Sequence, residues 1–336
     1  KAAREMKERV GGMLGQPAEG MPWLGTFHAI CVKLLRRHAE LAGLKSNFTI
    51  LDTDDVIRLL KQLIRAEGID DKRWPARTLA NVIDDWKNRA LVPTKVPVSD
   101  ASAYNGKGVD LYAQYQARLR ELNAVDFGDL LLHMVTIFQN HPDILEQYQR
   151  WFRFIMVDEY QDTNPVQNDL VLMLSEEHRQ VTVVGDSDQS VYSFRGADIR
   201  NILEFEEAFP DASVIVLEQN YRSTQSILDA ANAVISRNIG RKPKDLWTDE
   251  GPGEKIVRYH ADDESDEAQF VANELAKLHD HDQMRWDEMA VFYRTNSMSR
   301  VIEEFLVRVG IPYKVVGGTR FYDRREVKDA VAYLRA

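Results

Sequence analysis

The chain has 336 residues, which is too long for one ordinary hydrophobic core, so we expect two or more domains. Its hydrophobic share of 44% and charged share of 29% are typical of globular proteins, and no stretch holds the roughly 20 apolar residues of a membrane span. The net charge is −10, and residues 245–288, with 14 acidic and 4 basic side chains, account for all of it. The rest of the chain is neutral overall, so the charge neither supports nor excludes a nucleic-acid partner.

The first 150 residues are predicted to be mostly helical. The opening KAAREMKERV has the pattern of an amphipathic helix, and no apolar signal-peptide core follows it. Apolar residues recur at helical spacing in five more stretches: 27–42, 55–66, 77–90, 110–122 and 128–139. Residues 93–108 are rich in Pro, Ser, Gly and Asn and predict a loop. The single cysteine, Cys31, predicts a small buried apolar side chain in a reducing, cytoplasmic setting.

From Phe152 onward, strand-like and helical patterns alternate. Three short apolar runs are typical of buried parallel strands: 154–157, 181–184 and 214–217. Helical stretches lie between them at 164–176 and 198–208. The alternation then repeats, with strand-like segments at 255–260, 289–293 and 313–317 and helices at 264–279 and 297–309. The order predicts an α/β fold with βαβ units, a helical region inserted into the first unit, and a second unit from about residue 217.

The first predicted strand of this region ends in two acids, Asp158 and Glu159. In open α/β sheets, ligands bind at the carboxyl ends of strands. A carboxylate there can hold Mg²⁺ against nucleotide phosphates, and a second can orient or deprotonate an attacking water. A solvated acidic turn explains the same pattern equally well.

The next strand leads into GDSDQSVYSFRGAD (185–198). Gly185 allows a tight turn or a close backbone approach, and Gln189 is placed to reach a terminal phosphate or its water. Tyr192, Phe194 and Arg195 then combine aromatic faces with a guanidinium, which suits base stacking and phosphate contact. From the pattern alone, packing of Tyr192 and Phe194 in the core is slightly favoured over this interpretation.

The third strand runs into VIVLEQNYRST (214–224), with a helix predicted to be capped by Ser223 or Thr224. Arg222 lies where a second domain could insert a cation into the nucleotide site of the first. Such arginine fingers accelerate phosphoryl transfer about 10³- to 10⁵-fold. An ordinary surface arginine at a helix start is the alternative.

The three segments VDEYQDTN, GDSDQSVYSFRGAD and LEQNYRST, in this order at strand ends, resemble motifs II, III and IV of superfamily 1 helicases of the UvrD/PcrA/Rep type. Further segments resemble other parts of the same family: KAAREM (1–6), GTFHAICVKLLR (25–36), NAVDFGDLL (123–131), FYRTNSMSR (292–300) and VVGGTRFYDRREVKD (315–329). The resemblance spans essentially the whole chain.

The resemblance implies two RecA-like P-loop NTPase motor domains of parallel sheets flanked by helices. The first would comprise residues 1–48 and 122–216, with a helical insertion at 49–121. The second would comprise residues 217–321, and residues 322–336 would begin a second insertion.

The resemblance also implies roles for individual residues. Asp158 would bind Mg²⁺, Glu159 would activate water, Gln189 and Arg222 would meet the γ-phosphate, and Tyr221 would stack on the adenine of ATP. The residues implied at single-stranded DNA are Thr26, His28, Phe127, Tyr192, Phe194, Arg195, Arg294 and Asn296. Core packing remains the alternative for His28 and Phe127. Phe194 stands where close relatives often have Trp, which keeps a stacking face and removes the indole donor.

The function implied by the resemblance is ATP- and Mg²⁺-dependent 3′-to-5′ movement on single-stranded DNA, with strand separation at single/double-strand junctions. It would serve DNA repair or replication restart, with repair proteins as possible partners and no membrane. The setting would be the bacterial cytoplasm, associated with the nucleoid.

The phosphate-binding pattern G-x-x-x-x-G-K-S/T does not occur in the 336 residues. Because the family has this loop just upstream of KAAREM, we expect the chain to be a fragment that is inactive by itself. Two alternatives stay open. One is the motor of a RecB/AddA-type helicase–nuclease, and the other is a non-catalytic DNA-binding module.

Overall fold

The computed structural model describes residues 2–15 and 21–316. The chain divides into two compact units, the first comprising Lys1–Asn220 and Ala230–Trp247, and the second comprising Tyr221–Asp229 and Thr248–Ala336. Over the described ranges, no helix is both long and apolar enough to cross a membrane. The predicted segment 322–336 and most of 315–329 lie outside the described residues.

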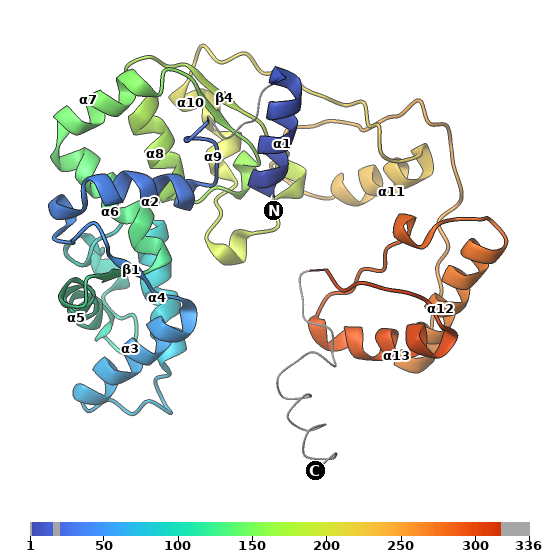
Figure 1. The fold of residues 1–336 in the computed structure, drawn as a ribbon, viewed down its shortest axis with the longest axis horizontal. Coiled ribbons are helices and arrows are strands. Elements are labelled where there is room, and N and C mark those ends of the chain that lie inside the picture. Colours follow the sequence, from blue (N-terminus) through green and yellow to red (C-terminus); the bar gives the residue numbers. More distant parts are fainter. Residues whose placement is uncertain (1, 16–20, 317–336) are drawn as a thin grey trace. The chain divides into compact units, whose positions relative to one another are not determined.

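The larger core of the first unit is formed by helices α2 (Phe27–Arg37), α6 (Phe127–Asn140), α7 (Pro142–Trp151) and α8 (Pro165–Ser175) (Figure 1). Helix α1 (Ala2–Leu14) precedes them. Local capping explains where α6 and α8 begin, because Asp126 and Asn164 each form a capping box with the residue three positions later. Cys31 lies buried in this core, so its predicted role as a small buried side chain is confirmed. Burial raises the pKa of its thiol to about 12.

A second core lies among helices α3 (Thr53–Ala66), α4 (Ala76–Asn88) and α5 (Gly108–Glu121). Trp86 of α4 stacks on Tyr112 of α5, with 5.7 Å between ring centroids. The chain enters and leaves this helical group through a two-stranded parallel sheet, β1 (Thr49–Ile50) with β2 (Ala124–Val125). The predicted loop 93–108 holds two short 3₁₀ turns, Pro93–Lys95 and Val98–Asp100.

A second parallel sheet pairs β3 (Ile155–Val157) with β4 (Val181–Val183), and Val157 lies opposite Val183. Helix α8 connects the two strands, so the predicted βαβ order is confirmed here. The predicted helix 198–208 forms as two short helices, α9 (Arg200–Leu203) and α10 (Phe205–Ala208). Because β3 and β4 are parallel, their carboxyl ends meet at one edge of the sheet.

Four of the predicted strands are wrong. Within the described residues, segments 214–217, 255–260, 289–293 and 313–316 form no strand and join no sheet. The predicted strand 154–157 is only partly buried, since Met156 of β3 is 78% exposed and Phe154, just before β3, is 77% exposed. An apolar pattern indicates that a segment could pack in a sheet, but it does not identify the second segment with which a strand must form its hydrogen bonds.

The second unit is built around two packed helices, α12 (Glu264–Asp280) and α13 (Ser299–Val309) (Figure 1). Both match the predicted helices, and their core contains Ala268, Ala272, Phe305, Leu306 and Ile311. Helix α11 (Gln225–Ile235) begins in this unit and ends in the first. Short 3₁₀ turns occur at Trp286–Glu288 and Asn296–Met298.

Candidate functional site

The shared edge of β3 and β4 carries the predicted acids. Asp158 and Glu159 follow β3 directly, and both are exposed. Glu159 has φ +55°, in the left-handed region that residues other than glycine rarely adopt. Strained backbone of this kind is concentrated at functional sites, where surrounding contacts hold it in place. The edge therefore presents two carboxylates from a constrained backbone.

Gly185, which follows β4, allows the two strand ends to approach closely. The backbone N–H of Tyr160 donates to the carbonyl of Val184 across 3.0 Å. A Cβ added at Gly185 would lie 2.5 Å from Oε1 of Gln161 and 3.1 Å from the backbone nitrogen of Tyr160. No side chain fits in that space, so the predicted close approach at Gly185 is confirmed.

Gln161 links the two strand ends through its buried amide. Its Nε2 donates to Oε2 of Glu159 across 2.6 Å, and its Oε1 accepts the backbone N–H of Asp186 across 3.0 Å. Asp186 in turn accepts a hydrogen bond at Oδ2 from Nε2 of Gln189, at 2.7 Å. The predicted water-activating acid and the predicted phosphate sensor are thus joined by a continuous hydrogen-bonded path. Sequence reasoning missed Gln161 and Asp186, although both are polar residues within four positions of a strand end.

The acids at this edge have the chemistry that Mg²⁺ needs. Asp158 offers an exposed carboxylate, of which Oδ1 accepts the N–H of Glu159 at 3.0 Å. Nearby, Asp162 has Oδ1 buried without a hydrogen-bond partner in the described structure, and burial together with Glu159 raises its pKa. Among the described residues, no group of three or more His, Cys, Asp or Glu side chains forms a complete metal site. A single exposed carboxylate can bind Mg²⁺ only together with other oxygen donors, such as phosphates or water.

Tyr192, Phe194 and Arg195 form one exposed cluster. The two rings are 39% and 75% exposed, so the core-packing alternative is wrong for both. Their centroids lie 6.0 Å apart, and the guanidinium carbon of Arg195 lies 5.3 Å from the Tyr192 centroid and 5.5 Å from that of Phe194. The arrangement presents aromatic faces and a positive charge together, as a nucleic-acid contact requires.

Phe127 and His28 form a second aromatic pair. Phe127 is 56% exposed at the first turn of α6, so its core-packing alternative is also wrong. The ring of His28 meets it edge-on at 5.9 Å, and Thr26 caps α2 just before it by accepting the N–H of Ala29. Burial lowers the pKa of His28, although Asp84 acts in the opposite direction. His28 is thus half-buried and neutral at physiological pH, beside an exposed ring.

Asn88, at the end of α4, joins the helical group to the strand-end segments. Its Oδ1 accepts from Nδ2 of Asn164 at 2.8 Å, and its Nδ2 donates to Asp84 at 3.2 Å. A Cβ on Gly196, which has φ +83°, would lie 2.9 Å from the same Nδ2. Sequence reasoning missed Asn88, because nothing local marks a surface asparagine in a helix as a contact between segments.

A buried ion cluster lies beside Phe127. The Nζ of Lys87, 1% exposed, is 2.7 Å from both Asp126 Oδ2 and Asp129 Oδ1. Tyr115 donates to Asp126 at 2.9 Å, and Gln116 donates to Asp129 at 2.8 Å. Burial opposes the charge on Lys87, but the two carboxylates outweigh it and raise its pKa. Burial would also raise the pKa of Asp129, yet Lys87 and the hydrogen bonds lower it to about 2.

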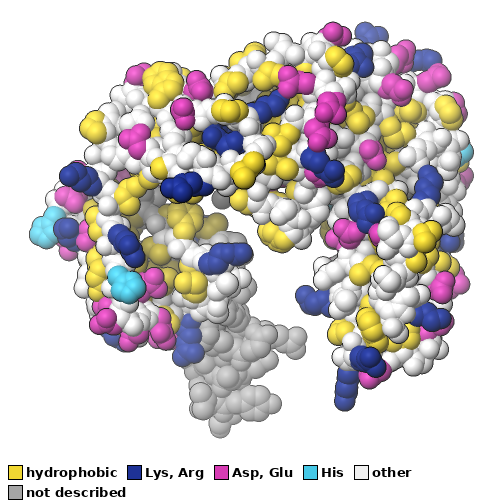
Figure 2. All heavy atoms as spheres, turned by 180° about the vertical axis from the view of Figure 1, so that it is seen from behind, with side chains coloured by type: hydrophobic (Ala, Val, Ile, Leu, Met, Phe, Trp, Pro, Cys, Tyr) yellow, Lys and Arg dark blue, Asp and Glu magenta, His cyan; other side chains and the backbone are white. Residues whose placement is uncertain are grey.

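The remaining predicted site residues lie in the second unit. Tyr221 and Arg222 are exposed just before α11, which begins at Gln225, directly after Thr224 as predicted. Arg294 and Asn296 are exposed at the 3₁₀ turn that precedes α13. On the face drawn in Figure 2, basic, acidic and hydrophobic side chains are interspersed.

Comparison with known proteins gives the same family for both parts of the chain. The family model of the UvrD/REP helicase N-terminal domain matches residues 1–210, and that of the UvrD-like helicase C-terminal domain matches residues 215–336. The chain is 51% identical to the ATP-dependent DNA helicase UvrD1 of Mycobacterium tuberculosis (strain ATCC 25618 / H37Rv), over all of its own length and 45% of that protein. It is 48% identical to the ATP-dependent DNA helicase PcrA of Bacillus subtilis (strain 168), again over all of the chain and 45% of the relative.

A third relative, the ATP-dependent DNA helicase PcrA of Staphylococcus aureus (strain NCTC 8325 / PS 47), is 47% identical over the whole chain and 46% of that protein. The chain therefore spans about half the length of these relatives. With the two family models covering nearly every residue, the chain belongs to the UvrD/REP helicase family.

Proposed function

We propose that this chain is part of the motor of an ATP-dependent DNA helicase that moves 3′ to 5′ along single-stranded DNA. The observation that carries the proposal is the continuous path from Glu159 through Gln161 and Asp186 to Gln189. It joins a candidate water-activating acid to a candidate phosphate sensor at the carboxyl edge of a parallel sheet. The names of the relatives, all ATP-dependent DNA helicases, support the same activity.

The proposed architecture is a pair of RecA-like motor domains that together bind ATP. The first would comprise residues 1–48 and 122–216, with 49–121 as a helical insertion, and the second would comprise residues 217–321, followed by the start of a further insertion at 322–336. The separate core of α3, α4 and α5, entered and left through the β1–β2 pair, supports treating the insertion as its own subdomain.

In the proposed chemistry, Glu159 orients and deprotonates the attacking water, and Gln161 holds its carboxylate in place. Asp158 supplies a ligand for Mg²⁺, which when bound neutralises the phosphate charge. Gln189 contacts the γ-phosphate, Arg222 acts as an arginine finger, and Tyr221 stacks on the adenine. Hydrolysis further needs a phosphate-binding loop, which these 336 residues do not contain, so we assign the activity to the complete protein and not to the chain alone.

The proposed DNA contacts use the exposed aromatic residues. Phe127, Tyr192 and Phe194 would stack on bases, each stack contributing about 1–3 kcal/mol, and Arg195 would contact phosphate. Thr26 and His28 lie beside Phe127, while Arg294 and Asn296 would contribute from the second unit. Alternating grips by these groups, driven by nucleotide-dependent closure, would advance the strand and open junctions during DNA repair or replication restart.

The test is the Glu159→Gln substitution in the complete protein. The amide keeps the size and the hydrogen bond to Gln161 but cannot accept the proton of water, so DNA-stimulated hydrolysis should fall by at least about 100-fold. Binding of ATP and of single-stranded DNA should stay close to wild type, as fluorescence titration would measure. Near-normal ATP hydrolysis in this variant would contradict the proposed role of Glu159 in activating the attacking water. A wild-type protein that binds DNA without hydrolysing ATP would favour a non-catalytic module.

A further inference from the structure

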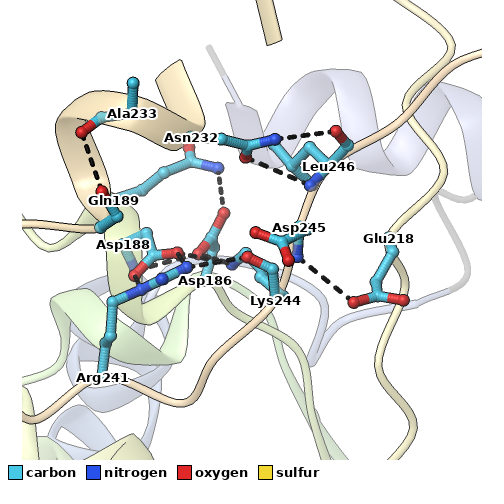
Figure 3. A network of polar contacts seen from close by, with 11 residues as sticks. Asp186, Asp188, Gln189, Glu218, Asn232, Ala233, Arg241, Lys244, Asp245 and Leu246 are labelled. Carbon is cyan, nitrogen blue, oxygen red and sulfur yellow. Dashed lines mark hydrogen bonds and ion pairs between the residues drawn. The ribbon is translucent and has the colours of Figure 1, made fainter. Parts of the chain in front are cut away.

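Two basic side chains of the segment Ala230–Trp247 meet the turn that carries Gln189, and all of these residues belong to the first unit. Arg241 makes a bidentate contact with Asp188, with Nε 2.9 Å from Oδ1 and a terminal nitrogen 2.8 Å from Oδ2. Lys244 pairs with Asp186, and its Nζ also lies 3.5 Å from Oδ2 of Asp188. Figure 3 shows both basic side chains directed at the two carboxylates.

The four side chains are largely shielded from solvent. Arg241 and Lys244 are each 15% exposed, Asp188 is 10% exposed and Asp186 is 23% exposed. Two positive charges thus meet two negative charges, so the cluster is electrically balanced. Shielded, charge-assisted hydrogen bonds of this geometry are stronger and more directional than pairs in open solvent.

The segment that supplies Arg241 and Lys244 is itself anchored. Arg241 donates to the backbone carbonyl of Lys244 at 3.0 Å, which fixes the two basic residues relative to each other. Asn232 exchanges two hydrogen bonds with the backbone of Leu246, at 2.9 and 3.2 Å (Figure 3). The backbone N–H of Asp245 donates to Glu218 at 3.3 Å. The basic side chains are therefore presented from a defined backbone.

Asp186 is the centre of the turn that this cluster holds. Its Oδ1 accepts the N–H of Asp188 at 2.9 Å, its Oδ2 accepts Nε2 of Gln189 at 2.7 Å, and its carbonyl accepts the N–H of Gln189 at 2.9 Å. Burial opposes the charge on Asp186, but the hydrogen bonds from Lys244 and Gln189 outweigh it and lower its pKa. The side-chain position of Gln189 thus depends on a carboxylate that Lys244 keeps ionised and oriented.

We propose that Arg241 and Lys244 are positioning residues for the phosphate sensor, holding the 186–189 turn in the shape in which Gln189 meets the terminal phosphate. This role rests on the proposed function of Gln189. It also gives the segment after α11 a direct influence on the nucleotide site, because a shift of that segment changes the contacts of Asp186 and Asp188 together. Neither basic residue touches the nucleotide in this role.

The experiment compares Arg241→Gln and Lys244→Gln with Lys242→Gln in the complete protein. Lys242 is the matched control, because it lies on the same segment and loses the same charge but pairs with Glu206, outside the turn. DNA-stimulated kcat should fall roughly 10- to 100-fold in the first two variants, as is typical when a reacting group is misplaced by about 1 Å. Affinity for ADP, which lacks the γ-phosphate, should stay within about twofold of wild type in all three.

A double-mutant cycle separates positioning from a general structural effect. Gln189→Ala should lower kcat by itself, and adding Arg241→Gln should lower it by less than about twofold more, because the group that was positioned is gone. Arg241→Lys keeps the positive charge but loses the two-pronged geometry of the guanidinium, so its kcat should lie between the values of wild type and of Arg241→Gln.

Three outcomes would overturn the role. Wild-type kcat in both Arg241→Gln and Lys244→Gln, full additivity with Gln189→Ala, or an equal loss of ADP affinity would each contradict it. Each of these outcomes leaves the proposed function intact, because in each case the wild-type protein still hydrolyses ATP when DNA is present. A wild-type protein without DNA-stimulated hydrolysis would overturn the proposed function and this role with it.

Discussion

Two ion clusters of the first unit use similar groups in different surroundings. In the cluster of Lys87, Asp126 and Asp129, one ammonium group meets two carboxylates in the interior. In the cluster of Asp186, Asp188, Arg241 and Lys244, two cations meet two carboxylates with 10% to 23% of each side chain exposed. In the first cluster two carboxylates share one cation, Tyr115 and Gln116 donate hydrogen bonds to them, and burial together with Asp129 raises the pKa of Asp126. The second cluster has equal numbers of acidic and basic groups.

The difference separates a structural from a functional use of charge. A charge removed from water is costly unless its partner stays in place, so the interior cluster ties the stability of the fold to Lys87. That cluster holds α4 against the start of α6, where a Cβ on Gly128 would lie 2.9 Å from Cδ of Lys87. The partly exposed cluster can lose one member and take up water. Its main effect should therefore be on the shape of the turn next to Gln189.

The largest expected effect comes from Lys87→Met. This substitution leaves Asp126 and Asp129 buried without their cation, and the free energy of unfolding should fall by about 3–5 kcal/mol. Urea denaturation of the complete protein measures the loss. Lys95→Met, at an exposed lysine that donates to Gln139, is the control and should change stability by less than about 0.5 kcal/mol. Equal stability of the two variants would contradict the structural role of the interior cluster.

Arg241→Gln should have a smaller effect on stability. Lys244 lies 3.5 Å from Asp188 and remains in this variant, and water can reach the carboxylate, so the free energy of unfolding should fall by much less than in Lys87→Met. The same urea titration measures it. A loss as large as that of Lys87→Met would show that the two clusters are equivalent and would break the comparison.

The last expected effect is on the pH dependence of stability, to which the interior cluster should contribute and the partly exposed cluster should not. His133 lies close to Asp129, and burial lowers its pKa although Asp129 acts in the opposite direction. His133 is therefore protonated less readily in the folded state than in the unfolded chain, where a histidine binds a proton below about pH 6.5. Stability should fall as the pH drops from about 6.5 toward the folded pKa, by at most about 1.4 kcal/mol per pH unit for one proton.

His133→Gln should reduce this slope between pH 7.5 and 5.5, while His28 and His38, whose pKa values are also lowered by burial, keep part of it. Arg241→Gln should leave the slope unchanged, because the hydrogen bonds and ion pairs that join Arg241 to Asp188 and Lys244, among the described residues, involve no histidine. A slope that stays at the wild-type value in His133→Gln would show that His133 does not contribute to the pH dependence of stability.

The helices were largely predictable, because their signals are local. The capping residues Asp126 and Asn164 act within three positions, and apolar spacing repeats within each helix. The predicted helix 27–42 ends at Arg37 and continues as a 3₁₀ turn, Ala39–Ala42, so boundaries were less well determined. Strands formed only where two segments pair, as in β3 with β4, and the other apolar segments predicted as strands, such as 214–217, formed none in the described residues.

The candidate site was predictable only in part. Asp158, Glu159 and Gln189 follow strands, so the rule that parallel strands share a carboxyl edge indicated them. Asn88, Gln161 and Lys244 were missed, since their partners lie 76, 25 and 58 positions away in the sequence. Sequence periodicity carries no information about such contacts.

What the sequence determined by itself was the kind of chemistry available, because acids and an amide after apolar strands, with an aromatic and basic segment behind them, are readable in order along the chain. Only the tertiary structure decided which of these groups are joined. A buried glutamine connects two strand ends, and a distant basic segment neutralises the turn between them. The physical reason is that hydrogen bonds and ion pairs depend on distances in space of about 3 Å, which chain order does not encode.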